Sequence, residues 1–213
     1  MKYIFVTGAP GSKWSSVIKN IYFSRDIDRS DFSHERTYYH DANGHMDLMH
    51  LGSYFDPGME FGDWFDRIEG HTRIECEQEF DRPFSGTGIR IIRSHVFAHN
   101  IEYLRTHWPE SPVVMVHRED DACLGWWVKC GHFNITYPDY RAYYKDLRVM
   151  AHRIEAQNGD ISMVWRSQPG IEPANNLELC DALGIARPTN TSSRQVYEYH
   201  DVSVKVLKGP HVR

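Results

Sequence analysis

Four short apolar runs, separated by segments with helical periodicity, constrain the fold of this chain more than any other feature. Each run has the length of a buried strand, and the four cover residues 3–6, 89–92, 113–116 and 160–165. The helical segments that follow the first three cover residues 14–24, 96–109 and 120–130. This alternation is typical of a doubly wound α/β fold, so we expect three layers, with a mainly parallel sheet flanked by helices.

Two further helices and one irregular region complete the expected organisation. A long amphipathic helix is expected over residues 138–157, with Asn158-Gly159 ending it, and a short helix is expected over residues 175–185. Residues 28–87 show little periodicity, and we interpret them as a loop-rich insertion. The length suits a single domain that spans residues 1–213.

Parts of the insertion and of the C-terminal region give a weaker signal. Some helix is expected over residues 63–80, where Trp64, Ile68 and Ile74 would face the core. Residues 194–213 show no pattern that decides between strand and loop.

Composition favours an intracellular globular protein. The net charge of −5 argues against a general nucleic-acid or membrane surface, while a local anion site remains compatible with it. The apolar runs are too short for a membrane span or a signal peptide. The four cysteines include no CxxC pair, so we interpret them as reduced thiols and expect a cytoplasmic protein.

Polar residues that suit an anion follow each predicted strand. In doubly wound sheets, ligands bind beyond the carboxyl ends of the strands. These positions hold the turn at residues 8–13, then Arg93 and His95, then His117 and Arg118, and finally Arg166.

The first of these turns, "GAPGSK", has the composition of a phosphate-binding loop. Backbone N–H groups from Gly8 to Ser15, the start of the following helix and the nearby serine hydroxyls all favour an anion. An ATP-binding Walker A loop requires G-x-x-x-x-G-K-[ST]. Here Lys13 stands where the second glycine belongs, and Trp14 stands where the lysine belongs.

This turn resembles the 5′-phosphosulfate loop of sulfotransferases that use 3′-phosphoadenosine 5′-phosphosulfate (PAPS), roughly P-[KR]-S-G-T-[TS] after a strand. Pro10 and Ser12 match the pattern, and Ser15 stands at the second hydroxyl. Gly11 replaces the usual cation, and Lys13 is the neighbouring residue that would supply its charge. The resemblance assigns cofactor binding to Gly8, Ala9, Pro10, Gly11, Ser12, Lys13, Trp14 and Ser15.

Two later segments resemble the same family. Arg93-Ser94-His95 is similar to a K-[TS]-H triplet that ends a strand, in which the histidine is the catalytic base. Arg118 stands at the arginine that binds the 3′-phosphate of PAPS. The serine that the family carries on the following helix is replaced here by Trp126.

The resemblance implies a P-loop-like sulfotransferase that moves a sulfuryl group from PAPS to a hydroxyl or amine of a small molecule or glycan. It makes His95, Arg93 and Lys13 the catalytic residues and Arg118 a cofactor-binding residue, and it requires no metal. Two alternatives stay open. One is a P-loop kinase of small molecules or nucleotides, and the other is a non-catalytic nucleotide-binding module.

A histidine-rich segment within the insertion carries residue types that bind metals. These residues are His40, Asp41, His45, Asp47 and His50. They form no H-E-x-x-H or comparable spacing. We therefore interpret this segment as a substrate-facing or capping loop.

Overall fold

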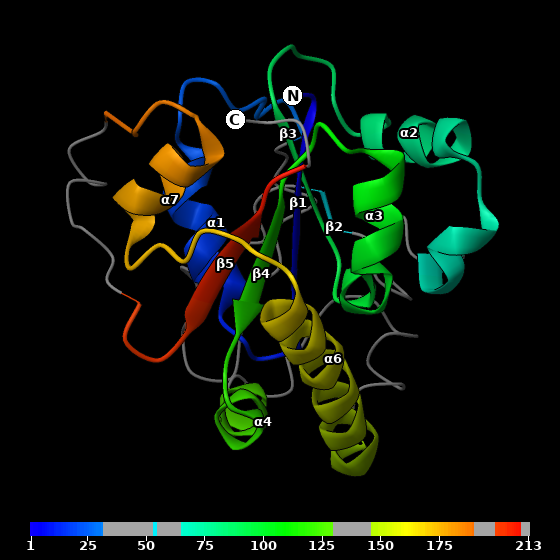
Figure 1. The fold of residues 1–213 in the computed structure, drawn as a ribbon, viewed down its shortest axis with the longest axis vertical. Helices are drawn as coiled ribbons and strands as arrows, with labels where there is room; N and C mark the ends of the chain where they lie inside the picture. The colour runs from blue at the N-terminus through cyan, green and yellow to red at the C-terminus, as the bar shows by residue number, and fades with distance from the viewer. Residues whose placement is uncertain (32–52, 55–64, 130–145, 190–198, 210–213) are drawn as a thin grey trace.

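Five strands form the central sheet of the computed structural model, which describes residues 1–31, 53–54, 65–129, 146–189 and 199–209 (Figure 1). The strands are β1 (Tyr3–Gly8), β2 (Ser53–Tyr54), β3 (Arg90–Arg93), β4 (Val113–His117) and β5 (Ser203–Leu207). Their order across the sheet is β2-β3-β1-β4-β5. The first four strands are parallel, and β5 runs antiparallel to β4. The expected mainly parallel α/β sheet is thus confirmed.

The central strands are apolar on both faces because helices cover both faces. Ile4 and Val6 of β1 pack against α1 (Trp14–Tyr22) and α7 (Asn176–Leu183) on one side of the sheet. Tyr3 and Phe5 face the other side. There they meet residues of α2 (Arg73–Asp81), α3 (Ile101–His107) and the 3₁₀ helices η2 (Phe65–Gly70) and η3 (Val96–Asn100). Figure 1 shows α1 and α7 together on the left and α2 and α3 on the right.

The long helix α6 (Leu147–Ser167) corrects two sequence predictions. Asn158-Gly159 does not end a helix, and residues 160–165 are helical rather than a strand. Apolar residues recur at helical spacing across the glycine, with Ile154, Ile161 and Val164 all buried. That continuous buried face outweighs the cost of one glycine in a helix, about 1 kcal/mol. The helix ends where Gln168 precedes a proline.

The C-terminal region supplies the strand that residues 160–165 do not. β5 pairs with β4 along its whole length, with Ser203 opposite His117 and Leu207 opposite Val113. Because β5 is antiparallel, its first residue lies at the edge of the sheet where β4 ends. The segment just before β5 is thereby brought to the carboxyl edge of the parallel strands.

The remaining predictions for the helices have mixed outcomes. The helices after the first three strands are confirmed as α1, as η3 with α3, and as α4 (Asp120–Lys129), and the short helix near residue 180 is confirmed as α7. Ile68 is buried as expected, but Ile74 is 70% exposed, so its inward orientation was wrong. Trp64 and residues 138–145 lie outside the described residues. None of the helices in the described ranges has the length and apolar character needed to cross a membrane.

Candidate anion-binding site

The candidate site lies at the carboxyl edge of the sheet, between β1 and β4. The chain leaves β1 toward β2 on one side of the sheet and leaves β4 toward β5 on the other. Neighbouring strands whose connections diverge in this way create the crevice in which α/β proteins bind ligands. Figure 1 shows this edge at the lower end of the sheet, where β4 runs toward α4.

The loop from β1 to α1 begins at this edge of the sheet. Gly11 and Lys13 both have left-handed backbone conformations, with φ of 80° and 62°. Ser12 N donates to Ala9 O at 3.0 Å, which closes the turn, and Ser16 N donates to Lys13 O at 2.9 Å. Within the described part of the chain, the N–H groups of Lys13 and Ser15 have no acceptor. Successive amides in such a turn form a concave surface that binds anions.

Ser12 adds a polar side chain without a partner. Its hydroxyl oxygen is fully buried and has no hydrogen-bond partner among the described residues. It lies close to Gly8, where an added Cβ atom would be 2.6 Å from Ser12 Oγ. A buried hydroxyl without a partner costs about 1–3 kcal/mol. A ligand oxygen in the loop would remove that cost, so Ser12 supports an anion site independently of the amides.

Gly11 rules out a loop cation at the position where the sulfotransferase pattern has one. A Cβ atom on Gly11 would lie 2.1 Å from the backbone oxygen of Cys123 on α4. The positive φ is a second obstacle to any other residue. The loop is therefore packed against α4, and a basic side chain at this position does not fit.

Lys13 and Arg118 supply the positive charge of the site, and both bind one carboxylate. Lys13 Nζ and Arg118 Nη2 donate to the same oxygen of Asp201, the latter at 3.1 Å. Arg118 Nη1 donates to Gly11 O at 3.1 Å and to Ala122 O at 2.8 Å, which ties the loop to α4. Lys13 Nζ also lies 5.1 Å from the centroid of the Trp126 ring. Arg118 thus lies beside the loop.

Asp201 is the site residue that sequence reasoning missed. It lies two residues before β5, a strand that the sequence left undecided. Burial would raise the pKa of its carboxyl, but the hydrogen bond and charge of Lys13 and the charge of Arg118 outweigh burial and lower it. Asp201 is therefore ionised at neutral pH and neutralises part of the charge that would attract an anion.

The turn after β3 is hydrogen bonded to the end of β1, where the loop begins. Thr7 Oγ1 donates to Ser94 O at 2.9 Å, and Ser94 N donates to Val6 O at 3.1 Å. His95 Nδ1 is hydrogen bonded to the backbone oxygen of Gly8, the first residue of the loop. Its ring stacks on Trp14 with centroids 3.9 Å apart and an angle of 17°. The predicted catalytic histidine and the predicted phosphate loop are therefore brought into direct contact.

The hydrogen bond to Gly8 fixes the tautomer of a neutral His95. A carbonyl oxygen only accepts, so Nδ1 must carry the proton. Nε2 of the neutral ring is then unprotonated and can accept a proton. His95 is 4% exposed, so its ring is largely shielded from bulk water.

Arg93, the last residue of β3, is buried near Trp14 at the start of α1. Its side chain is fully buried, and its guanidinium carbon is 5.8 Å from the centroid of the Trp14 ring. The Trp14 ring is thus close to both His95 and Arg93. This arrangement favours a supporting role for Arg93, as a buried positive charge behind the loop.

Other residues that the sequence singled out lie elsewhere. Arg166 does not follow a strand, because it belongs to the last turn of α6. It lines a shallow hollow with His117 and Trp165 on the α6 side of β4. His99 pairs with Asp160 of α6 at 2.6 Å. The histidine-rich segment at residues 40–50 lies outside the described residues, and within the described ones no group of three or more potential metal ligands occurs.

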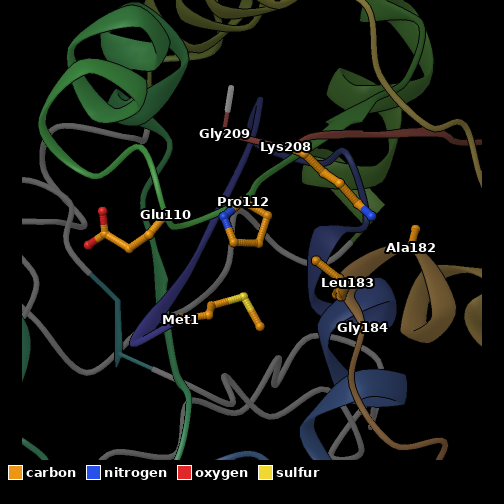
Figure 2. A pocket seen from close by; sticks show the side chains of 8 residues that line it. All are labelled: Met1, Glu110, Pro112, Ala182, Leu183, Gly184, Lys208 and Gly209. Atoms are coloured by element: carbon orange, nitrogen blue, oxygen red, sulfur yellow. The ribbon is translucent and has the colours of Figure 1, made fainter. Parts of the chain in front are cut away.

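A second hollow lies at the opposite edge of the sheet (Figure 2). Its lining includes Met1 before β1, Pro112 before β4 and Lys208 after β5. These positions mark the edge where the parallel strands begin. The hollow is therefore separated from the loop and from His95 by the length of the strands, and we do not assign it to the candidate site.

Comparisons with known proteins identify no relative. No protein-family model matches the sequence, and neither a search of curated proteins nor a search of solved structures finds a match. Function must therefore be inferred from the geometry at the carboxyl edge of the sheet.

Proposed function

We propose that this protein is a sulfotransferase that transfers a sulfuryl group from PAPS to a hydroxyl or amine. The observation that supports the proposal is the contact between His95 and the loop, because a histidine ring that can accept a proton lies beside a turn whose geometry suits an anion. The acceptor substrate belongs to the class of small molecules or glycans. The chemistry requires an anion cradle, a base and in-line positioning of the two substrates.

In the proposed reaction, Nε2 of His95 accepts the proton of the attacking hydroxyl or amine as its oxygen or nitrogen bonds to sulfur. The bond between sulfur and the bridging phosphate oxygen breaks, and 3′-phosphoadenosine 5′-phosphate (PAP) leaves. The amides of the loop, the Ser12 hydroxyl and Lys13 stabilise the charge that develops on the departing 5′-phosphate. Arg118 supplies further positive charge to the co-substrate.

The kinase alternative finds less support in the same geometry. A kinase would need a carboxylate at a strand end to hold Mg²⁺. Glu119 and Asp120 are the first acidic residues after β4, and Asp120 Oδ1 accepts a hydrogen bond from Asn158 Nδ2 at 2.6 Å. That bond holds Asp120 at the start of α4.

A ligand panel tests the proposal. PAP without metal should stabilise the protein by about 2.7 kcal/mol at a hundredfold excess over its Kd. ATP should stabilise it less, with or without Mg²⁺, and adenosine 5′-monophosphate should also do less because it lacks the 3′-phosphate. Thermal unfolding with each ligand measures the effect.

Stabilisation by Mg-ATP alone would establish the kinase alternative. Absence of any response would leave the non-catalytic module.

A further inference from the structure

One carboxylate oxygen occupies the centre of the candidate site. Asp201 Oδ2 accepts from both Lys13 Nζ and Arg118 Nη2, so these two nitrogens are close enough to share one ligand oxygen. The contact spans most of the chain, because Asp201 reaches the loop only through the antiparallel pairing of β5. Carboxylate and phosphate oxygens are alternative partners for the same cations.

We propose that Asp201 is an internal competitor for the anion site. Its carboxylate neutralises Lys13 and Arg118 in the free protein, and a bound anion must displace it from both. Asp201 thereby sets which ligands bind. A singly charged anion that replaces the carboxylate gains little binding free energy. A phosphate or pyrophosphate group carries more charge and gains more. This inference rests on the anion-binding part of the proposed function and not on sulfuryl transfer.

The surroundings of Asp201 allow this displacement. The Asp201 side chain is 44% exposed, while those of Lys13 and Arg118 are 21% and 11% exposed. Arg118 is also held by Gly11 O and Ala122 O, which do not depend on Asp201. When the carboxylate leaves, Arg118 therefore stays in place and only the segment before β5 has to move.

Asp201→Asn tests the inference because amide and carboxylate have the same shape. Exposed ion pairs are weak, so removing the competing charge should tighten binding by about 3- to 10-fold. Titration calorimetry should measure this gain for inorganic pyrophosphate and, separately, for PAP. Asp181→Asn is the matched control, since Asp181 pairs with Arg187 at α7, away from the loop, and its loss changes the net charge equally.

Four outcomes are distinct. Tighter binding of both ligands in Asp201→Asn, with Asp181→Asn unchanged, supports the competitor and the nucleotide site together. If Asp201→Asn binds pyrophosphate more tightly and PAP binds no better than pyrophosphate, Asp201 competes with anions but the site is not specific for the nucleotide. If the wild type binds PAP and Asp201→Asn binds it equally or less tightly, Asp201 positions the cations, and the proposal that it competes with the ligand is wrong. If no protein binds either ligand, both proposals fall.

A second variant tests the route of the effect. If Asp201 acts by occupying Lys13, the gain from Asp201→Asn in pyrophosphate affinity should shrink in a Lys13→Ala background. An equal gain with and without Lys13 would show that Asp201 does not act by occupying Lys13 and would overturn the proposal that it competes for both cations.

Discussion

At the scale of single residues, His95 is held by two independent contacts. The Gly8 carbonyl fixes which nitrogen carries the proton, and the Trp14 ring fixes the plane of the imidazole. Trp14 stands where a Walker A loop has its lysine and where the sulfotransferase pattern has a threonine. The departure from both motifs thus has a structural explanation, because the indole supports the histidine.

His95→Ala should lower the rate of sulfuryl transfer by about 10²–10⁴-fold, the usual contribution of a positioned base. PAP affinity should change little, because the loop and Arg118 remain. Steady-state kinetics and PAP titrations measure the two quantities.

His99→Ala and His117→Ala serve as controls for that experiment. His99 pairs with Asp160, and His117 lines the hollow beside Trp165, so each has surroundings different from those of His95. Near-normal transfer in His95→Ala, or a comparable loss in either control, would remove His95 as the base.

The residues of the site differed in how far the sequence could predict them. The strand–turn–helix pattern and the turn after the second apolar run placed Gly8, Ser12, Lys13 and His95 correctly at one edge, because motif and strand end are local features. Asp201 could not be found in this way. Its position depends on the direction and register of β5, which pairs with β4 over a long sequence separation.

At the scale of secondary-structure elements, the errors arose where local signals competed with packing. Asn-Gly is a common helix end, yet α6 passes through it because its buried face continues on both sides. The short segment "SVKVL" shows only a weak alternation of apolar and polar residues. It forms a strand because it pairs with the edge of β4. Propensity is a weak prior when tertiary contacts decide.

Two glycines in these elements should respond oppositely to the same substitution. Gly159→Ala should stabilise the protein by about 0.5–1 kcal/mol, because a Cβ there meets no atom within 4 Å and alanine favours helix. Gly11→Ala should destabilise it by about 1–3 kcal/mol or more, because the new Cβ would overlap Cys123 O. Denaturant unfolding of both variants gives the comparison. A neutral Gly11→Ala would mean that the loop does not pack against α4 as described.

At the scale of the whole molecule, charge is placed at both edges of the sheet. The carboxyl edge holds Lys13, Arg118 and Asp201. Toward the opposite edge, Asp81 at the end of α2 accepts hydrogen bonds from Lys2 and Tyr3 Oη, each at 2.7 Å, and from Arg90 of β3. This second cluster joins the start of β1, β3 and the helix that covers one face. It links segments that are far apart in the sequence.

The Asp81 cluster should make stability fall in acid. Burial would raise the pKa of the Asp81 carboxyl, but hydrogen bonds from Lys2, Tyr3 and Arg90 outweigh burial and lower it. A carboxyl whose pKa is lower in the folded state contributes stability that is present above the unfolded pKa, about 3.9, and is lost as pH falls through the folded pKa.

Asp81→Asn should lower the free energy of unfolding by about 1–3 kcal/mol at pH 7. It should also flatten the loss of stability as the pH falls below about 4. Urea unfolding of both proteins over this range measures the two slopes, with Asp181→Asn as the control because its ion pair with Arg187 is exposed. Equal slopes in wild type and Asp81→Asn would show that the acid sensitivity comes from other carboxylates.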